Sequence, residues 1–481
     1  MQLDPDHCYV SLNARDSRFD GLFYVGVTST GIYCRPICPT RVPRRDNCRF
    51  FANAASAERE GFRPCLRCRP ELAPGGAPMD AVGRLAGLAV ARIDAGALNE
   101  GSFDQLAADL GISGRQLRRA VERHYGVAPV ELAQTRRLLL AKQLLTETQI
   151  KIADVAFASG FSSLRRFNHL FQSRYRLSPG ALRRSQSPAA ATDSVTLKLA
   201  YRPPLDWDSL LGFLAGRGAA GVEAAEGRRY LRAVRIGKCA GWIAVEPAEK
   251  EAALRAEVSL GLLPVLTPLL ARLRRLFDLD ANPQAIDQHL MADPQLRERV
   301  ERRPGLRVPG AFDGFELALR AVLGQQVSVK AATTIFGRFA RAYGEPLATP
   351  FAAVTSTGPR PALIAAADEG EIAGLGMPGA RARTVLGLAR AVSEGRLRLE
   401  PGVDPERVVA ALREVPGIGD WTAQYVAMRA LRDPDAFPAS DLGIYRALGV
   451  SRPRDAIAAA EGWRPWRAYA VLHLWLGQGG G

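Results

Sequence analysis

The sequence contains no run of about 20 apolar residues, which is the length that a helix needs to cross a membrane. Its first residues, MQLDPDHCYV, lack the basic and apolar segments of a secretory signal, so we expect a cytoplasmic protein without a membrane partner. Disorder is excluded, because 47% of the residues are hydrophobic and 23% are charged. At 481 residues, the chain is expected to form about three or four domains.

Lysine and histidine are scarce, and arginine supplies nearly all of the positive charge. The net charge is +15, of which residues 1–190, with 27 basic and 17 acidic side chains, contribute +10. A positive field favours phosphate backbones or anionic membranes as partners, although an arginine excess can also reflect genome composition. The asymmetry predicts that the N-terminal part is the stronger polyanion binder.

Cysteine is rare after residue 68, where only Cys239 follows six cysteines crowded at the start of the chain. In a cytoplasmic protein such crowding indicates a metal site and not a disulfide scaffold. Two pairs have the spacing of zinc ligands, namely Cys34 with Cys38 and, 26 residues later, Cys65 with Cys68. Zinc takes four soft ligands in a tetrahedron, so we expect one Zn²⁺ held by these four residues. Cys8 and Cys48 are expected to be core residues.

The segments VTSTGIYCRPICPTR (27–41) and GFRPCLRCRP (61–70) strongly resemble the zinc domain of Ada-type DNA alkylation-repair regulators. The resemblance implies that Cys34 removes a methyl group from a methylated DNA phosphate and keeps it. It implies DNA-backbone contacts at Thr30, Arg41 and Arg63. A zinc ion with a structural role alone is the alternative.

Two segments follow a plan of helix, glycine turn and basic helix, FDQLAADLGISGRQLRRAVERHYGVAP (103–129) and KIADVAFASGFSSLRRFNHLFQSRYRLSPGALR (151–183). Both resemble the paired helix-turn-helix motifs of AraC-type transcription regulators, whose second helix enters the major groove. The candidate DNA-reading residues are Arg115, Gln116, Arg118 and Arg119 in the first motif and Ser162, Ser163, Arg165 and Arg166 in the second. A solvated helix face is the alternative for the arginines. Four phenylalanines are expected in the core: Phe157, Phe161, Phe167 and Phe171.

Polar or Pro/Gly-rich breaks divide the chain at 70–80, 183–194 and 302–315. After the second break, the segments 195–201 and 230–247 alternate apolar and polar residues, which predicts antiparallel strands. Helical spacing dominates from about residue 250.

Three glycines, Gly374, Gly376 and Gly379, match the letters of a dinucleotide-binding loop. No strand pattern precedes them, so we predict a turn between two helices instead. The isolated histidines His289 and His473 are expected to have structural roles.

The segment EVPGIGDWTAQYVAMRAL (414–431) contains a Pro-Gly-Ile-Gly turn whose backbone N–H groups can face a DNA phosphate between two helices. Asp441 follows Gly419 by 22 residues. This combination closely resembles the helix-hairpin-helix superfamily of DNA glycosylases, and similarity to the AlkA-type 3-methyladenine glycosylases runs from about 194 to 476. It implies hydrolysis of the bond between an alkylated base and its sugar, with Asp441 stabilising an oxocarbenium-like transition state. A salt-bridged structural aspartate is the alternative.

The same resemblance implies a base pocket formed by Phe213, Trp421, Tyr425 and Trp475. An aromatic pocket can hold a flipped cationic base by stacking and cation–π attraction. The hairpin glycines Gly417 and Gly419 would contact the DNA backbone, and a monovalent cation can accompany them. Because the chain has no cysteine-rich tail, we expect no iron–sulfur cluster.

Three further residues affect the expected chemistry, and two of them, Gln326 and Leu442, depart from common residue types of that family. Trp421 stands where strand-cutting relatives have a Schiff-base lysine, so base removal without lyase chemistry is expected. Gln326 replaces an apolar wedge that fills the space left by the flipped base, and Leu442 replaces an aromatic residue. Both leave the substrate range open.

The predicted fold is therefore multidomain and mostly α with α+β parts. Its domains would be a zinc methyl-acceptor domain (1–76), a paired helix-turn-helix domain (77–186), an antiparallel-sheet α+β domain (194–309) and an all-α helix-hairpin-helix glycosylase domain (310–481). The predicted function is dual: excision of alkylated bases, and methyl acceptance that strengthens promoter binding. The alternative is a methylation-sensing activator with an inactive glycosylase half.

We expect a monomer in the bacterial cytoplasm that binds alkylated and promoter double-stranded DNA at the nucleoid, with RNA polymerase as a further partner. The Pro-Cys-His motif of the methylguanine methyltransferase is absent, so repair of that lesion is not expected.

Overall fold

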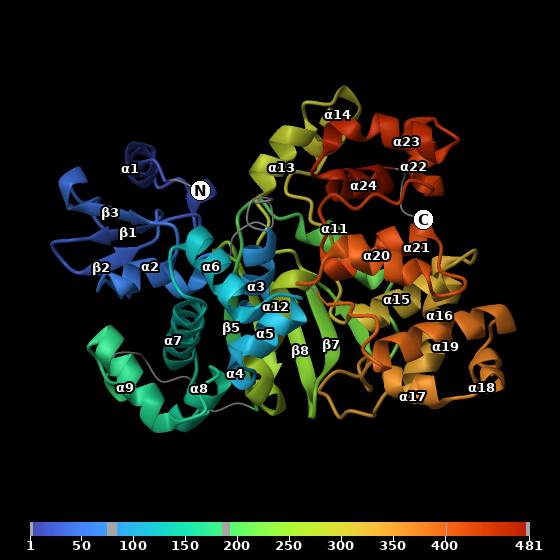
Figure 1. Cartoon of the computed structure of the whole chain (residues 1–481), viewed down its shortest axis with the longest axis horizontal. Coiled ribbons are helices and arrows are strands. Elements are labelled where there is room, and N and C mark those ends of the chain that lie inside the picture. The colour runs from blue at the N-terminus through green and yellow to red at the C-terminus, as the bar shows by residue number, and fades with distance from the viewer. Residues whose placement is uncertain (1–2, 75–83, 185–192, 401, 478–481) are drawn as a thin grey trace. The chain divides into compact units, whose positions relative to one another are not determined.

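The computed structural model describes residues 3–74, 84–184, 193–400 and 402–477 (Figure 1). They form two compact units. The first unit consists of residues up to 203 together with 248–271 and 279–281, and the second of 204–247, 272–278 and the residues from 282 onward. The predicted breaks at 70–80 and 183–194 lie partly outside the described residues. Within the described ranges, no helix is long and apolar enough to span a membrane.

The first unit begins with a small sheet of order β3-β1-β2-β4, in which only the β2–β4 pair is parallel. Its elements are α1 (Pro5–Asn13), β1 (Tyr24–Val27), β2 (Ile32–Cys34), β3 (Cys48–Phe51), α2 (Ala54–Arg59) and β4 (Arg63–Pro64). These strands are two to four residues long, too short to show an alternating pattern, so sequence reasoning did not predict them.

Helices follow as predicted: α3 (Arg84–Asp94), α4 (Ala97–Glu100), α5 (Phe103–Asp109), α6 (Gly114–Tyr125), α7 (Pro129–Glu147), α8 (Ile152–Ala158), α9 (Leu164–Tyr175) and α10 (Pro179–Arg184). The pairs α5–α6 and α8–α9 are the two helix-turn-helix motifs. Each turn contains a glycine with positive φ, Gly111 at +74° and Gly160 at +88°, a conformation that other residues adopt at a cost. The internal repeat in the sequence is therefore confirmed as a repeated fold.

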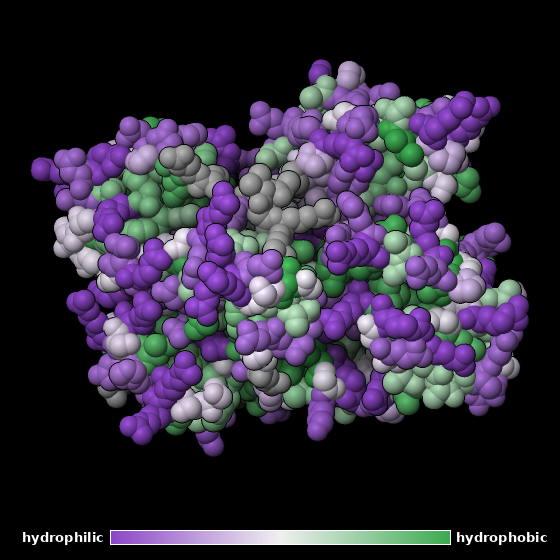
Figure 2. All heavy atoms as spheres, in the orientation of Figure 1, coloured by the Kyte–Doolittle hydropathy of each residue, from purple (hydrophilic) through white to green (hydrophobic). Residues whose placement is uncertain are grey.

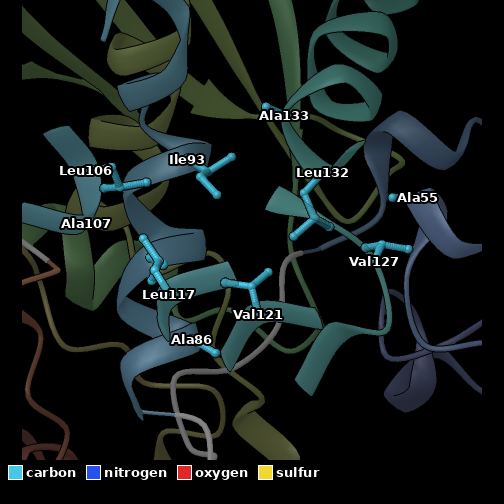
Figure 3. Packing of buried hydrophobic residues seen from close by; sticks show 11 residues of the cluster. Ala55, Ala86, Ile93, Leu106, Ala107, Leu117, Val121, Val127, Leu132 and Ala133 are labelled. Carbon is cyan, nitrogen blue, oxygen red and sulfur yellow. The ribbon is translucent and has the colours of Figure 1, made fainter. Parts of the chain in front are cut away.

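Figure 3 shows the hydrophobic cluster that holds the first helix-turn-helix motif together. Leu117 and Val121 of α6 are fully buried there with residues of α3, α5 and α7. Ala55 of α2 belongs to the same cluster, and Leu139 of α7 packs among buried residues of the zinc-domain sheet. The zinc domain and the helical domain thus share buried residues in two hydrophobic clusters.

A buried carboxylate, Glu58 of α2, joins these parts. It accepts hydrogen bonds from the hydroxyls of Tyr33 on β2 (3.0 Å) and Thr135 on α7 (2.8 Å). Arg174 of α9 donates to its backbone oxygen (3.0 Å). Burial raises the pKa of Glu58 to about 7 from an ordinary value of 4.5, although its two hydroxyl donors and nearby Arg174 favour the ionised form.

Replacing Glu58 by glutamine should remove a pH dependence of stability. The folded state keeps the Glu58 proton up to about pH 7, whereas the unfolded chain loses it near pH 4.5, so wild-type stability falls as pH rises between these values. The loss is up to about 3 kcal/mol. Between pH 5 and pH 8, the unfolding free energy of the wild type should therefore fall relative to that of the Glu58→Gln variant. The exposed neighbour Glu60→Gln is the control, and an equal shift there would contradict the assignment.

Two further groups of strands confirm the antiparallel strands predicted at 195–201 and 230–247. They also contain strands at 223–226 and 253–259 that were not predicted, the second of them in the region expected to be helical. In the first unit, β5 (Ser194–Ala200) pairs with β9 (Ala253–Ser259). In the second unit, β6 (Glu223–Glu226), β7 (Arg229–Ile236) and β8 (Cys239–Pro247) form a meander.

The rest of the second unit is helical. Its helices are α11 (Trp207–Ala215), α13 (Pro283–Leu290), α14 (Pro294–Arg302), α15 (Gly314–Leu323), α16 (Val329–Tyr343), α17 (Pro361–Ala366), α18 (Glu369–Gly374), α19 (Gly379–Ser393), α20 (Pro405–Arg413), α21 (Asp420–Val426), α22 (Leu442–Leu448), α23 (Pro453–Ala459) and α24 (Arg467–Leu476). Another helix, α12 (Leu266–Leu276), begins in the first unit's residues and ends in the second's. Because α18 directly precedes α19, the glycines at 374–379 form a turn between helices, as predicted.

Hydrophilic side chains cover most of the face shown in Figure 2, with apolar residues in small scattered groups. Two of the exposed large apolar side chains are Leu442, which is 67% exposed, and Phe157, which is 52% exposed. The prediction that Phe157 lies in the core is wrong. It sits between buried Ala156 and Ala158 on α8, and successive helical residues point about 100° apart, so it falls off the packed face.

Candidate functional sites

The four predicted zinc ligands come together. The Sγ atoms of Cys34, Cys38, Cys65 and Cys68 all lie within 4.8 Å of one another, and all four residues are buried. Cys34 ends β2 and Cys65 follows β4, and the parallel pairing of these strands brings the two cysteine pairs side by side. A tetrahedral zinc ion requires sulfur atoms about 3.8 Å apart, given Zn–S bonds of about 2.3 Å. The cluster fits a single Zn²⁺, which confirms the predicted cofactor.

The four sulfur atoms differ in their hydrogen bonds. Three of them have a hydrogen-bond partner outside the cluster. Cys38 pairs with the Thr40 hydroxyl (3.1 Å), Cys65 with the Arg67 N–H (3.4 Å) and Cys68 with the Arg35 N–H (3.3 Å). Within the described residues, Cys34 Sγ has no such donor beyond its three partner cysteines. A thiolate without hydrogen bonds is the better nucleophile, because its lone pairs are not engaged.

Arg35 is a residue whose structural role sequence reasoning missed. Its buried guanidinium forms a salt bridge with Asp20 and donates to the backbone oxygen of Cys68 (3.2 Å). It therefore ties the loop after Cys34 to the second cysteine pair. Cys8 and Cys48 are buried outside the cluster, which agrees with their predicted core role.

The predicted DNA-backbone residues lie at the surface of the zinc domain. Thr30, in the turn between β1 and β2, and Arg41 are exposed, whereas Arg63 on β4 is half-buried. In the helix-turn-helix motifs most candidates are exposed: Arg115, Gln116, Arg118, Arg119, Ser162, Arg165 and Arg166. At these exposed positions the side chains are accessible to DNA.

Two of the candidate DNA-reading residues have a local task as well. The Gln116 side chain accepts from the backbone and hydroxyl of Ser113 at the start of α6, in a capping box. Ser163 caps α9 by accepting from the Arg166 N–H (3.3 Å). These hydrogen bonds at the helix starts occupy the side-chain oxygens of two residues that we predicted to contact DNA.

Asp441 in the second unit is half-buried and held by three N–H donors. Its Oδ1 accepts from Trp475 Nε1 (2.9 Å) and from the Ile444 backbone (2.9 Å), and its Oδ2 accepts from Trp421 Nε1 (2.8 Å). Asp441 is also the N-cap of α22, where the helix dipole favours negative charge. Among the described residues, all three of its hydrogen bonds come from neutral N–H groups and none comes from a cation, so the structure does not show the salt-bridged alternative.

The aromatic candidates form a cluster around this carboxylate. Trp421 and Tyr425 are four residues apart on α21, so their rings stack at 5.2 Å with an 8° angle. Trp475 of α24 lies 6.2 Å from Tyr425. Phe213 of α11 is buried and meets the cluster through Arg429, whose guanidinium lies 4.9 Å from the Phe213 ring and 5.4 Å from the Tyr425 ring.

Arg429 was not predicted as a site residue. Helix α21 continues into a π-helical turn (Ala427–Leu431), a wider turn that often occurs at functional sites. Arg429 in this turn is 6% exposed and donates to the Tyr425 hydroxyl (2.6 Å), and to the backbone oxygens of Pro309 (2.8 Å) and Gly310 (3.1 Å). The signal in the sequence was an arginine within the otherwise apolar run AMRAL (427–431), because arginine is seldom buried without partners.

The hairpin before α21 has the predicted glycine geometry. Gly417 has a φ of +90°, and a Cβ there would lie 2.1 Å from Thr384 Oγ1, so the turn requires glycine. Gln325 donates to the Gly417 oxygen (3.1 Å), which links the hairpin to the wedge segment. The next residue, Gln326, is exposed with a φ of +55°. Gly419 is the N-cap of α21.

Replacing Trp475 by phenylalanine should lower the rate of any reaction that depends on the Asp441 carboxylate by about tenfold or more, since it removes one charge-assisted hydrogen bond but keeps an aromatic ring. Single-turnover base release from methylated DNA measures it. The matched control is Trp463→Phe, which removes a similar indole bond, to Asp293 (2.6 Å), elsewhere in this unit. Equal rates for both variants would count against a role of the Trp475 N–H.

Comparison with known proteins identifies the domains in which these sites lie. Four family models match: the metal binding domain of Ada (residues 7–71), a helix-turn-helix domain (106–185), the AlkA N-terminal domain (196–313) and the HhH-GPD superfamily of base excision DNA repair proteins (319–461).

Three curated relatives show the extent of the similarity. The "Probable bifunctional transcriptional activator/DNA repair enzyme AlkA" of Mycobacterium tuberculosis is 41% identical over 99% of this chain and 97% of that protein. DNA-3-methyladenine glycosylase 2 of Escherichia coli is 39% identical over 58% of this chain and 97% of that protein. The bifunctional transcriptional activator/DNA repair enzyme Ada of Escherichia coli is 49% identical over 15% of this chain and 20% of that protein. With a relative matched over nearly its whole length, the chain belongs to the family of AlkA-type bifunctional transcriptional activators and DNA repair enzymes.

Proposed function

We propose that the second unit is a monofunctional DNA glycosylase that removes 3-methyladenine-type bases by hydrolysis. The observation that carries the proposal is the Asp441 carboxylate, held by three N–H groups at the edge of an aromatic cluster. The E. coli relative named for this activity, DNA-3-methyladenine glycosylase 2, supports the substrate class.

The chemistry follows from the charge of the reactants. Alkylation at a ring nitrogen makes the base a cation, which weakens its bond to the sugar, and the Trp421, Tyr425 and Trp475 rings offer π faces to such a base. As the bond breaks, positive charge develops on the sugar. Asp441 Oδ1 already accepts two hydrogen bonds, so Oδ2, which accepts one from Trp421, has the free lone pair that faces the sugar and the attacking water.

No strand cleavage is expected from this site. Lyase chemistry requires an amine that forms a Schiff base with the sugar. At that position the chain has Trp421, whose indole N–H is directed at Asp441 instead. The products are then a free base and an abasic site.

For the first unit we propose irreversible methyl transfer from a DNA methylphosphotriester to Cys34. The Cys34 sulfur would attack the methyl carbon, forming a C–S bond while the C–O bond breaks, and the phosphate would leave as an ordinary anionic diester. Bound zinc would keep the four cysteine sulfurs deprotonated at neutral pH. The absence of an outside hydrogen bond at Cys34 Sγ, among the described residues, supports this choice over the other three cysteines.

Methylation would convert an anionic thiolate into a neutral thioether and so raise the charge of the DNA-facing surface by one. The positive potential toward phosphate then increases, which favours tighter binding at a promoter. The two hydrophobic clusters that the zinc domain shares with the helical domain give the change a direct connection to the DNA-reading part. We also propose that the protein acts as a monomer and activates transcription through RNA polymerase.

One experiment tests both activities. Duplex DNA with isotope-labelled methyl groups is incubated with the zinc-loaded protein and separated into protein, polymer and free-base fractions. Label in the Cys34 peptide and in free bases is expected. Label only in free bases would reduce the zinc domain to a structural module, and label only on protein would leave a methylation-sensing activator with an inactive glycosylase fold.

A further inference from the structure

The aromatic cluster of the second unit has two ends of opposite charge. The Asp441 carboxylate lies at one end, joined to the Trp421 indole by a hydrogen bond of 2.8 Å. Beyond the stacked Tyr425 ring lie two guanidinium groups, those of Arg429 and Arg217. The mechanism proposed above uses only the anionic end, and no role is assigned to the two arginines.

The two arginines differ in how firmly they are held. Arg429 donates hydrogen bonds to the Tyr425 hydroxyl and to two backbone oxygens, so it holds the Tyr425 ring in place. Arg217 is half-buried, and its guanidinium lies 3.8 Å from the centre of the Phe213 ring, in van der Waals contact with one face, and next to the Tyr425 phenol. Burial, and to a smaller extent the like charge of Arg429, lowers the pKa of Arg217, while the Tyr425 phenol, which accepts a hydrogen bond from it, acts in the opposite direction. A further hydrogen-bond acceptor from a ligand would add to this stabilisation of its charge.

The polarity of the cluster orients a flipped nucleotide. The sugar must lie near Asp441, because positive charge develops there during bond cleavage. The far edge of a purine, position 6 of the six-membered ring, then points away from Asp441 toward the cationic end. Guanine-type bases carry a carbonyl oxygen at this position, which accepts hydrogen bonds, whereas adenine-type bases carry an amino group, which donates them.

We propose that Arg217 is a specificity-determining residue that donates a hydrogen bond to the 6-carbonyl oxygen of an excised base. The inference rests on the proposed base-excision function. Arg217 contributes binding to alkylated guanine-type bases and none to 3-methyladenine, whose 6-amino group meets a second donor. A site that hydrogen-bonds one substrate discriminates strongly against an analogue lacking that partner.

The test compares two lesions with the same methyl position and the same charge, 3-methylguanine and 3-methyladenine. Duplex DNA treated with an isotope-labelled methylating agent contains both, and the two free bases are separated after single-turnover reaction with the full-length protein. Their ratio is independent of the amount of active enzyme. It is measured for wild type, Arg217→Met, which removes the donors but keeps much of the bulk, and Arg217→Lys, which keeps the charge.

In the Arg217→Met variant the ratio of 3-methylguanine to 3-methyladenine release should fall about tenfold or more, with lysine in between. The control Arg228→Met, an exposed arginine of the same unit, should keep the wild-type ratio. An unchanged ratio in Arg217→Met, including an equal loss of both bases, would overturn the assignment. Release of neither base by the wild type would instead refute the base-excision function itself.

Discussion

Replacing Asp441 by asparagine should slow single-turnover release of alkylated bases by about a thousandfold. Asparagine has the same shape but no charge, and a carboxylate about 4 Å from a developing cation contributes about 4 kcal/mol at an effective dielectric constant near 20. The NH₂ group of asparagine is also a donor, so it would face one of the indole N–H groups from which Asp441 now accepts a hydrogen bond. Free-base release with enzyme in excess gives the rate, and DNA affinity is measured separately.

The matched control is Asp293→Asn, which also alters an aspartate bonded to an indole N–H, that of Trp463. It should retain the wild-type rate of base release. If Asp441→Asn retains that rate as well, Asp441 does not act on the reacting sugar. If the wild type itself releases no base, the activator with an inactive glycosylase half becomes the better description.

Replacing Cys34 by serine should abolish methyl uptake by the protein while base release continues at the wild-type rate. A serine hydroxyl stays protonated at neutral pH, so it cannot attack the methyl carbon as a thiolate does. Retained label on the full-length protein after exposure to methylated duplex DNA is the readout, and the methylated peptide is identified after digestion. Zinc content of each variant shows whether the site still holds metal.

Cys48→Ser is the control for this second change, because Cys48 is buried in the same domain but outside the four-cysteine cluster. It should accept methyl groups like the wild type. Methyl uptake that persists in Cys34→Ser would show that another sulfur is the acceptor, and the hydrogen bonds at Cys38, Cys65 and Cys68 would then not decide nucleophilicity.

Local patterns in the sequence were sufficient for the zinc ligands, the two helix-turn-helix motifs and the hairpin. Each depends on close spacing along the chain: Cys34 with Cys38 forms one ligand pair, and Gly417 forms a turn that only glycine allows. The antiparallel strands at 195–201 and 230–247 were predictable for the same reason, since their side chains alternate every second residue.

Other features depend on contacts between distant segments, so only the tertiary structure decided them. The Arg35 N–H reaches Cys68 across 33 residues of sequence, and Arg429 meets Phe213 from a helix more than two hundred residues away. Phe157 points to solvent because α8 packs its other side against α7 and α9. The sequence by itself determined which chemistry the residues can perform, because ligand pairs, turns and helix faces are local. The tertiary structure decided which of those residues meet, because burial and hydrogen bonding between segments far apart leave no periodic signal in the chain.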